Sequence, residues 1–199
     1  WLVHLVRRGP LVFNIQDVFP DAAVRTGAIT NRAVIAAASW LERFSYRRSA
    51  AVTVLSGDLR DNVAAKLPAR LAGRVHVIPN FVDVDRVVPM PSGTPWRSEQ
   101  GLDGRPVVMY AGNVGFSQSL DLMLHAAGEL PDVQFVINGD GAAAAALRAE
   151  AAGRSNVFFT GYQPAERLPE VLASADVHVV PLRAGLGSVS VPSKTYSIL

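Results

Sequence analysis

Residues 107–124 read Val-Val-Met-Tyr-Ala-Gly-Asn-Val-Gly-Phe-Ser-Gln-Ser-Leu-Asp-Leu-Met-Leu, and this stretch decides the fold. Its apolar run 107–111 has the length of a buried strand, and Gly112 and Gly115 indicate a short loop before a helix. Such a unit leaves free backbone N–H groups and the positive end of a helix dipole at the carboxyl end of the strand. The stretch therefore predicts a site for an anion, typically a phosphate.

The helix expected after this loop can be capped by Ser117 or Ser119. Its apolar positions Leu120, Leu124 and Ala127 fall on one face, so we expect that face to be buried.

Short apolar runs and helical patterns alternate along the rest of the chain. The expected strands are 11–15, 51–55, 75–78, 133–137, 157–159 and 177–180. The expected helices are 30–48, 59–66, 142–152, 165–174 and a last one opened by Pro192-Ser193-Lys194. This alternation is typical of parallel βαβ units, so the predicted fold class is α/β.

Residues 79–105 interrupt the alternation with prolines and glycines, which are typical of a hinge or linker. We therefore expect two domains, over residues 1–83 and 84–199. The chain begins with Trp1 and stops inside an expected helix, so we expect it to be an internal fragment of a longer protein.

The composition bounds the class of protein. Of the 199 residues, 49% are hydrophobic and 18% are charged, which favours a buried core over disorder. Cysteine is absent, so disulfides and thiolate zinc sites are excluded. A net charge of +2 is too small to indicate nucleic-acid binding. No run reaches the roughly 18 apolar residues of a membrane span.

The helix expected over 30–48 is amphipathic and ends in a basic, aromatic stretch. Thr30 or Asn31 can cap it, and its expected apolar stripe comprises Val34, Ile35, Ala38, Leu41 and Ser45. The stretch 40–48 contains Trp40, Arg43, Phe44, Tyr46, Arg47 and Arg48. Its cations compensate the helix dipole, or the stretch contacts anionic lipid.

Polar, glycine-bearing turns follow most strands of the second expected domain, at 112–115, 138–141, 161–163 and 185–190. The carboxyl ends of parallel strands meet at one edge of a sheet, where open α/β sheets bind ligands. Glycine lets a ligand approach the backbone closely, although any parallel sheet needs turns there. In the first expected domain, Asp17 and Asp21 occupy such a loop. They are candidates for acid/base chemistry or hydroxyl binding, or they only shape the loop.

Lys194 is the most informative charge. It lies at the expected start of a helix, where a cation opposes the helix dipole. This placement favours an anion bound beside it, and Arg183 is a weaker candidate for the same role. The alternative is an exposed lysine that extends into water.

Several other sites are disfavoured. A dinucleotide site needs a third glycine and an acidic residue at the end of the second strand, where this chain has Ser117 and Asn138. A P-loop is absent, because no glycine series precedes Lys194. The four histidines, His4, His76, His125 and His178, lack metal-ligand spacing.

Five segments, in this order, resemble a known family. They are Val-Ile-Pro-Asn-Phe-Val-Asp (77–83), Val-Met-Tyr-Ala-Gly-Asn-Val-Gly (108–115), Phe-Val-Ile-Asn-Gly-Asp-Gly (135–141), Val-Phe-Phe-Thr-Gly-Tyr (157–162) and Leu-Ala-Ser-Ala-Asp-Val-His-Val-Val-Pro-Leu (172–182). The chain resembles the retaining, glycogen-synthase-like (family 4) glycosyltransferases of the GT-B fold. Its Asp-Val-Phe-Pro-Asp loop (17–21) and Ser-Val-Pro-Ser-Lys segment (190–194) are similar to the bacterial group that builds surface polysaccharide or O-antigen.

The resemblance implies two Rossmann-like parallel-sheet domains that face a cleft, both incomplete here. Residues 1–83 would be the last part of the acceptor-binding domain with the hinge, and residues 84–199 a truncated donor-binding domain. The implied activity is transfer of a hexosyl or N-acetylhexosaminyl group from a UDP- or GDP-type sugar to a glycan or lipid-linked acceptor. It would proceed with retention, without a metal or other cofactor, and in the cytoplasm at the inner face of the plasma membrane. This fragment alone would be inactive.

The resemblance also implies roles for individual residues. Gly112, Asn113, Gly115 and Lys194 would bind the donor diphosphate, with Lys194 stabilising the leaving group. The nucleotide would contact Asn138, Gly139, Tyr162, Gln163, Leu168 and Ser197. The donor sugar would contact Gly187, Ser188, Val189 and Ser190. Asp17 would lie on the acceptor side.

The chain departs from the family pattern in two places. Many members carry Arg and Lys around the first glycine turn, where this chain has Asn113 and Gln118-Ser119. Many also carry two glutamates eight residues apart, where this chain has Val189 and Ser197. The departures leave two alternatives open: a GT-B-fold sugar-nucleotide 2-epimerase, and a non-catalytic sugar-nucleotide-binding protein.

Overall fold

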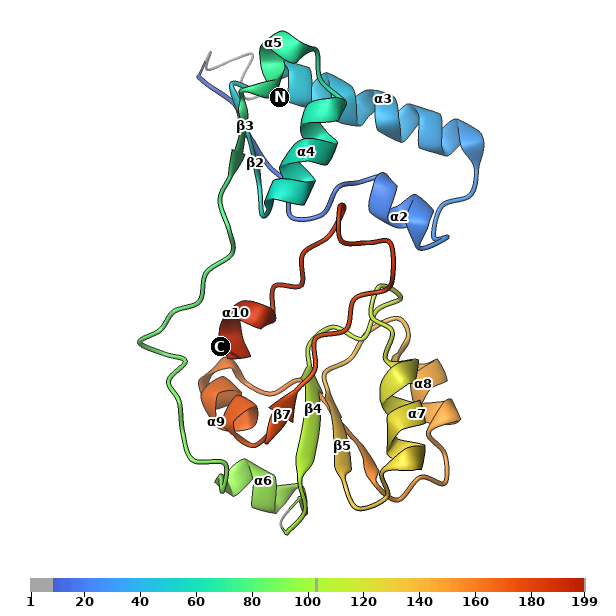
Figure 1. Ribbon diagram of the computed structural model, residues 1–199, viewed down its shortest axis with the longest axis vertical. Helices are drawn as coiled ribbons and strands as arrows, with labels where there is room; N and C mark the ends of the chain where they lie inside the picture. Colours follow the sequence, from blue (N-terminus) through green and yellow to red (C-terminus); the bar gives the residue numbers. More distant parts are fainter. Residues whose placement is uncertain (1–8, 103, 199) are drawn as a thin grey trace. The chain divides into compact units, whose positions relative to one another are not determined.

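The computed structural model describes residues 9–102 and 104–198 and forms two compact units (Figure 1). The first unit comprises the chain up to Asn80 together with Ala184–Val191. The second comprises Phe81–Arg183 and the residues from Pro192 on. The segment 184–191, which we expected in the second domain, therefore belongs to the first unit. His4 lies outside the described residues.

The first unit contains a three-stranded parallel sheet in its described part. Its strands, in spatial order, are β1 (Val12–Asn14), β2 (Ala51–Val54) and β3 (Val75–Val77). Its helices are α2 (Asp21–Arg25), α3 (Arg32–Arg48), α4 (Gly57–Ala65) and α5 (Ala69–Ala72). Val52 and Val54 of β2 and Leu59 and Val63 of α4 are all fully buried. The strand–helix alternation confirms the predicted α/β class.

Helix α3 buries only part of the predicted stripe. Asn31 caps it as expected, because its Oδ1 accepts the N–H groups of Ala33 and Val34. The buried residues are Glu42 and Tyr46, whereas Leu41 of the predicted stripe is 56% exposed. Ile35, Ala38 and Ser45 of the predicted stripe are half-buried, whereas the prediction was wrong for Val34, which is exposed like Leu41. The buried face is shifted towards Glu42 and Tyr46, because polar groups that bond one another can be buried.

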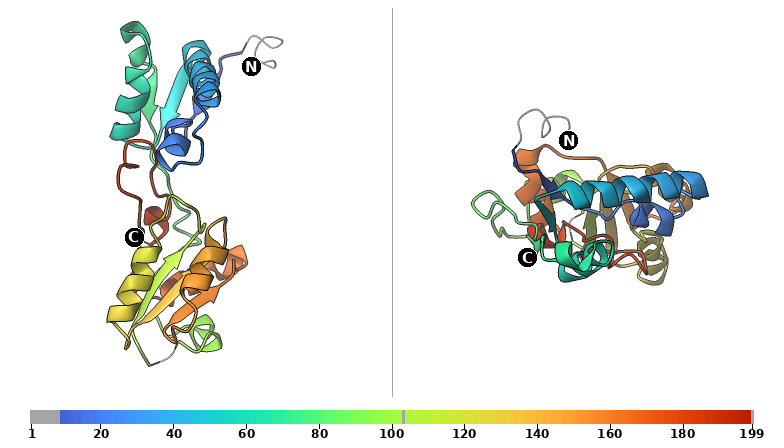
Figure 2. Two further views of the ribbon diagram at one scale, coloured as in Figure 1. Left: turned by 90° about the vertical axis from the view of Figure 1, so that its right-hand side faces the viewer. Right: turned by 90° about the horizontal axis from the view of Figure 1, so that it is seen from above.

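The second unit contains a four-stranded parallel sheet in its described part, in the order β6-β5-β4-β7. Its strands are β4 (Val107–Ala111), β5 (Gln134–Asn138), β6 (Val157–Thr160) and β7 (Val177–His178). Its helices are α6 (Pro95–Glu99), α7 (Asp121–Glu129), α8 (Ala144–Glu150), η1 (Ala165–Arg167), α9 (Leu168–Ala173) and α10 (Thr195–Ile198). Two further views show helices on both faces of this sheet (Figure 2).

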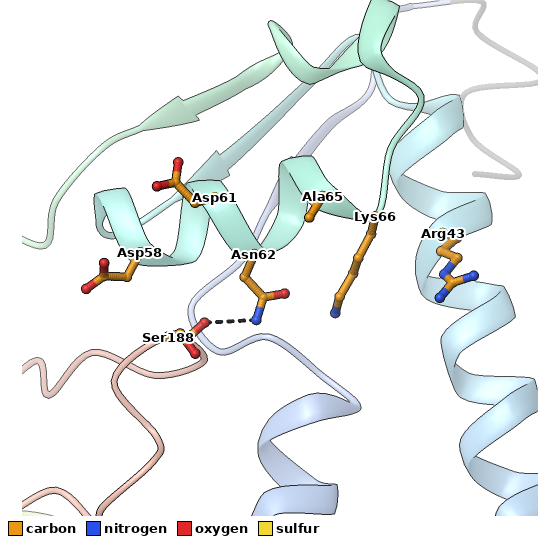
Figure 3. Close-up of a pocket in the computed structure, with 7 residues that line it drawn as sticks. All are labelled: Arg43, Asp58, Asp61, Asn62, Ala65, Lys66 and Ser188. Atoms are coloured by element: carbon orange, nitrogen blue, oxygen red, sulfur yellow. Dashed lines mark hydrogen bonds between the residues drawn. The ribbon is translucent and has the colours of Figure 1, made fainter.

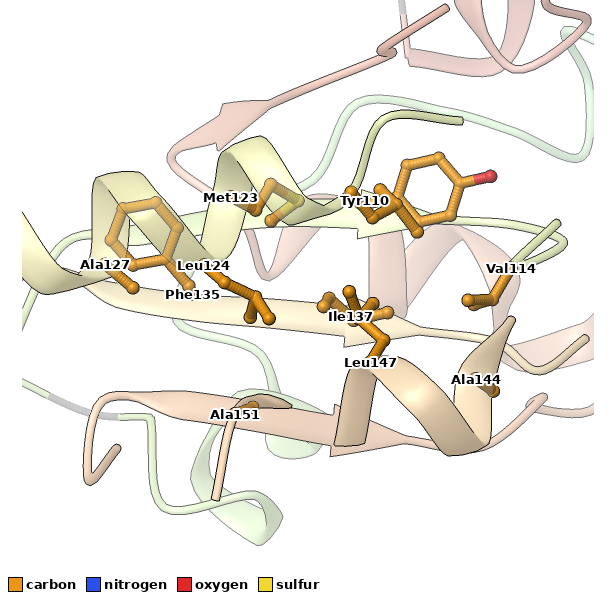
Figure 4. Close-up of a cluster of buried hydrophobic side chains, with 11 residues drawn as sticks. Tyr110, Val114, Met123, Leu124, Ala127, Phe135, Ile137, Ala144, Leu147 and Ala151 are labelled. Carbon is orange, nitrogen blue, oxygen red and sulfur yellow. The ribbon is translucent and has the colours of Figure 1, made fainter. Parts of the chain in front are cut away.

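Strand β5 separates two hydrophobic layers. Phe135 and Ile137 pack with α7 and α8, in the cluster drawn in Figure 4. Val136 points to the other face and packs with Trp96 of α6 and Val171 of α9. Alternate side chains of a strand point to opposite faces, so a strand covered on both faces is buried throughout.

Helix α7 confirms its predicted face but not its predicted cap. Leu120, Leu124 and Ala127 are buried. The helix begins at Asp121, however, with Leu120 at the N-cap position and no side-chain cap. Ser117 and Ser119 therefore lie before the cap position and do not have the predicted role.

A polar network fixes α6 to the rest of the second unit. The Arg97 guanidinium bonds both carboxylate oxygens of Asp176, at 3.2 and 3.0 Å. Asp176 also accepts the N–H of Val107 at 2.7 Å. The Arg97 hydrogen bonds hold the pKa of the Asp176 carboxyl below its ordinary value, against the opposing effect of burial. The network therefore ties the end of the linker to the first strand of the second sheet.

Asp176→Asn is expected to lower the free energy of unfolding at pH 7 by about 1–3 kcal/mol, as for lost hydrogen bonds to a charged group. A carboxyl whose folded pKa is lowered stabilises the fold above its unfolded pKa, about 3.9, and this contribution is lost as the pH falls towards the folded pKa. The difference between the variant and wild type should therefore shrink below about pH 4. Urea unfolding at pH 7 and below about pH 4 measures the stability difference between the variant and wild type. Asp132→Asn, at an exposed site, is the control. Equal stability of Asp176→Asn and wild type at pH 7 would contradict it.

Candidate nucleotide-binding site

Two glycine turns at the carboxyl ends of β4 and β5 pack backbone against backbone. The Gly112 N–H donates to the Asn138 carbonyl at 2.8 Å. A Cβ on Gly139, whose φ is +137°, would lie 1.9 Å from the Gly112 carbonyl oxygen. A Cβ on Gly141 would lie 2.5 Å from the Val114 carbonyl oxygen. The absence of side chains therefore allows the two turns to meet.

Most of the backbone N–H groups that the sequence predicted to be free donate hydrogen bonds to protein acceptors. Besides Gly112, Val114 donates to the Asp140 carbonyl at 2.9 Å. Gly115 donates to the Asn113 carbonyl and to Gln118 Oε1, both at 3.1 Å. Within 112–115, only the Asn113 N–H has no partner among the described residues. The prediction of several free N–H groups was wrong, because the second turn and Gln118 supply their acceptors.

The Tyr110 side chain forms a hydrogen bond with the first turn. Its hydroxyl donates to the Asn113 carbonyl at 2.7 Å. Burial, with a smaller effect of Tyr162, raises the pKa of Tyr110 to about 12. The hydroxyl therefore keeps its proton at neutral pH and remains a donor.

A cavity of about 90 Å³ opens beside the first turn. Seven predicted residues line it: Gly112, Asn138, Tyr162, Gln163, Leu168, Lys194 and Ser197. They come from parts of the second unit that are far apart in sequence. Sites for drug-sized ligands measure roughly 300–1,000 Å³, so this cavity has room for only part of a sugar nucleotide.

Lys194 lies across Gly112. A Cβ on Gly112 would be 3.1 Å from Lys194 Cε and 3.4 Å from Cγ. Lys194 directly precedes α10, one residue before the helix begins, and is exposed. Its ammonium makes no ion pair with any described residue, which leaves the charge available to an anion. Arg183 is placed near the same turn, because its N–H donates to the Ser117 carbonyl at 2.9 Å.

The Asn138 and Tyr162 side chains in the cavity lining form hydrogen bonds with other protein groups. The Asn138 amide donates to Thr160 Oγ1 at 2.8 Å and to the Gly161 carbonyl at 3.1 Å. The Tyr162 hydroxyl donates to the Asp140 carbonyl at 3.0 Å, while 63% of the residue is exposed. Leu168 is 38% exposed, whereas Val171 and Leu172 are the buried residues of α9. Tyr162 and Leu168 therefore offer apolar surface to a ligand.

The family relationship follows from the sequence together with this fold. Residues 105–193 match the family model described as "Glycosyl transferases group 1", and residues 1–86 match "Glycosyltransferase Family 4". The fold is similar to that of Anabaena HepE in complex with UDP and glucose, with a TM-score of 0.70 and 16% identity over 89% of this chain and 47% of that one. Glycosyltransferase family models thus match both parts of the chain, and its fold is similar to that of GT-B glycosyltransferases. WaaG, a glycosyltransferase involved in lipopolysaccharide biosynthesis, shares the fold with a TM-score of 0.63 and 16% identity over 92% of this chain and 56% of that one.

Two curated glycosyltransferases illustrate the sequence similarity. Alpha-D-kanosaminyltransferase of Streptomyces kanamyceticus is 32% identical over 157 residues, which are 73% of this chain and 40% of that protein. The putative colanic acid biosynthesis glycosyl transferase WcaI of Escherichia coli is 28% identical over 198 residues, 94% of this chain and 48% of that protein. The chain thus spans somewhat less than half the length of these relatives.

The remaining predicted residues lie apart from the cavity lining. Asn113, Gly115 and Gly139 form the turns but do not line the cavity. The segment Gly187–Ser190 belongs to the first unit. There, the side chain of Val189 is fully buried, and its carbonyl accepts the Val18 N–H at 2.7 Å. The predicted sugar contact through the Val189 side chain is therefore not available in this arrangement.

The first unit has a polar pocket of about 590 Å³ (Figure 3). Its lining residues are Arg43, Asp58, Asp61, Asn62, Ala65, Lys66 and Ser188. The Lys66 ammonium lies 2.9 Å from Asp21 and 2.7 Å from Glu42. Asp21, a candidate acid or base in the sequence, is thus engaged in an ion pair. Asp17 accepts a hydrogen bond from Ser190 Oγ at 2.5 Å.

Two residues of this unit were not identified from the sequence. Arg25 and Asn62 bond the segment around Ser188, which lies more than 120 residues away along the chain. No local pattern marks such a long-range contact.

Gly139→Ala is expected to destabilise the second unit strongly, because the new methyl group would overlap the Gly112 carbonyl. Gly153→Ala is a matched control: its φ of +84° is also positive, but no atom lies within 4 Å of the position that its new methyl group would take. Left-handed backbone alone costs about 1–2 kcal/mol. Denaturant unfolding should give a loss for Gly139→Ala at least about twice that of Gly153→Ala. Equal losses would show that the turns can separate easily.

Proposed function

We propose that this chain is part of an enzyme that transfers a sugar from a nucleoside diphosphate donor to a glycan or lipid-linked acceptor. The observation that carries the proposal is the unpaired Lys194 ammonium across Gly112, at the carboxyl end of a central parallel strand. Parallel sheets bind nucleotides at this edge. The names of the relatives support the reaction class, since they describe transferases of kanosamine and of colanic acid biosynthesis.

The proposed mechanism depends on charge that develops on the leaving diphosphate. As the bond between sugar and oxygen breaks, this charge grows, and a fixed cation lowers the free energy of the transition state. Lys194 supplies the cation. The Asn113 N–H is the backbone donor left free in the turn, so Lys194 contributes more than in a site with several free N–H groups. We propose retention of configuration, as in the family that the sequence resembles, and name no nucleophile.

The nucleotide is proposed to lie between the second glycine turn and α9. Tyr162 and Leu168 offer exposed apolar surface on which a base can stack, and Ser197 offers a hydroxyl to the ribose. The lining does not distinguish a uracil from a guanine base. We propose that binding and transfer need no metal ion.

Two further elements of the function are proposals. A role in bacterial surface polysaccharide is supported by the similarity to WcaI, whose name refers to colanic acid biosynthesis. The other relative is named only for transfer of a kanosaminyl group. Peripheral contact with anionic lipid is supported by α3, where Trp40 stacks on Phe44 with ring centroids 5.5 Å apart, beside the exposed Arg43, Arg47 and Arg48. Tyr46 does not contribute, because it is buried. No helix among the described residues is long and apolar enough to span a bilayer.

A panel of nucleotide sugars tests the donor. UDP-glucose, UDP-N-acetylglucosamine and GDP-mannose, each in EDTA, are added to the full-length protein, and its melting temperature is measured. The true donor at 100 times its Kd should add about 2.7 kcal/mol to the free energy of unfolding. A shift with release of free sugar or transfer to an acceptor supports the enzyme, whereas a shift without either indicates a non-catalytic binding protein. An epimerised nucleotide sugar would indicate the epimerase.

Lys194→Met in the full-length enzyme is expected to lower kcat by roughly 10²-fold or more, since the variant keeps the aliphatic stem but loses the ammonium. Lys194→Arg keeps the charge and should recover much of the rate. Steady-state kinetics with the donor found by the panel measure both. A fall of less than about threefold for Lys194→Met, with unchanged donor affinity, would exclude the role in leaving-group stabilisation.

A further inference from the structure

The backbone N–H of Asn113, which has no partner among the described residues, has a direction that the second turn fixes. The Gly112 carbonyl oxygen lies 1.9 Å, and the carbonyl carbon 2.9 Å, from the position that a Cβ on Gly139 would take. The carbonyl bond therefore points at Gly139. Because the peptide between Gly112 and Asn113 is trans and planar, its N–H points the opposite way. The Asn113 N–H is thus directed away from the second turn.

The next peptide unit of the first turn is held by hydrogen bonds from both of its polar groups. The Asn113 carbonyl accepts the Tyr110 hydroxyl at 2.7 Å and the Gly115 N–H at 3.1 Å. The Val114 N–H donates to the Asp140 carbonyl at 2.9 Å. Tyr110 makes the shortest of these bonds, and it makes it from a side chain outside the turn. Since the peptide units before and after Asn113 are both fixed, its backbone has little freedom to rotate.

The tyrosine ring that carries this hydroxyl is packed in the core of the second unit. Tyr110 is 4% exposed and belongs to the hydrophobic cluster that contains Met123, Leu124 and Ile137. Figure 4 shows the ring beside Met123, with its hydroxyl directed away from that residue. A ring in a close-packed interior cannot shift without displacing its neighbours. The hydroxyl therefore has a fixed position from which it binds the first turn.

The Lys194 side chain approaches the same place. A Cβ on Gly112 would lie 3.2 Å from the Tyr110 hydroxyl oxygen and 3.1 Å from Lys194 Cε. The two side chains thus border the position that glycine leaves empty at residue 112. Because Cε carries the ammonium nitrogen, the cation lies next to the peptide unit that contains the Asn113 N–H.

We propose that Tyr110 is a positioning residue for the donor diphosphate. Its hydroxyl holds the first turn so that the Asn113 N–H and the Lys194 ammonium bind the same anion. This inference rests on the proposed function, in which the diphosphate lies at Lys194, and every group that it uses belongs to the second unit. Tyr110 is buried, so it acts through the turn and not by contact with the diphosphate.

A positioning role predicts a loss of affinity that is specific to the second phosphate of the ligand. A nucleoside diphosphate carries one phosphate more than the matching monophosphate, whereas base and ribose are the same. Loss of the Tyr110 hydroxyl should therefore weaken binding of the diphosphate more than binding of the monophosphate. A merely structural role would weaken both equally, because the proposed base and ribose contacts are made by Tyr162, Leu168 and Ser197.

The test compares Tyr110→Phe with wild type in the full-length protein, and Tyr46→Phe is the matched control. Tyr46 is also buried, and its hydroxyl donates to Glu42 at 2.8 Å in the first unit. Isothermal titration calorimetry with UDP, UMP, GDP and GMP gives the ratio of diphosphate to monophosphate affinity. Tyr110→Phe should lower this ratio by about threefold or more, in line with the net contribution of one hydrogen bond. Lys194→Met should lower it further, and Tyr46→Phe should leave it unchanged.

Hydrogen exchange without any ligand shows separately whether the hydroxyl holds the turn. Tyr110→Phe keeps the ring, and the Asn113 carbonyl keeps the Gly115 N–H, so the variant should fold and exchange about threefold faster or more in the peptide containing 112–118. Unchanged exchange would overturn the proposed contact. A diphosphate-to-monophosphate ratio within about 1.5-fold of wild type, or an equal fall in Tyr46→Phe, would overturn the positioning role. Failure of the proposed function is distinguishable, because wild type itself would then bind none of the four nucleotides or show no preference for the diphosphates.

Discussion

The contact between the two glycine turns is the constraint on which the second unit depends. Gly139 has room for no atom beyond its backbone, because the Gly112 carbonyl occupies the position of a side chain. The contact brings the ends of β4 and β5 together and turns the backbone N–H groups of the first turn towards protein acceptors. The contact also changes how the first turn can attract an anion. The turn that looks most like an anion site in the sequence keeps one N–H without a partner among the described residues, so the proposed phosphate site depends mainly on the charge of Lys194.

The two lysines of the chain illustrate how partners decide the role of a charge. Lys66 is enclosed by Asp21 and Glu42, and Tyr46 donates a further hydrogen bond to Glu42. This network joins α2, α3 and the end of α4, so its charges are used within the fold. Burial and the neighbouring Glu42 raise the pKa of Tyr46, which keeps its hydroxyl a donor. Lys194 has no such partner among the described residues, and its charge is left for a ligand.

The segment 184–191 shows why the order of residues is a poor guide to which unit holds them. It follows β7 of the second unit in sequence, yet its hydrogen bonds run to Arg25, Asn62, Asp17 and Val18 of the first.

Seven of the residues that line the cavity were expected from the resemblance to a known family. The sequence by itself determined the α/β class, the parallel strands and the buried face of α7, because hydrophobic periodicity and glycine position are local properties. It determined the N-cap of α3 for the same reason. Only the tertiary structure decided which N–H groups stay free at Gly112–Gly115, which face of α3 is buried and where residues 184–191 pack. Each of these depends on acceptors or ion-pair partners distant in the chain, such as Asp140, Lys66 and Arg25. A local pattern indicates which secondary structure a segment can form. Partners distant in the sequence decide which of its polar groups stay free to bind a ligand.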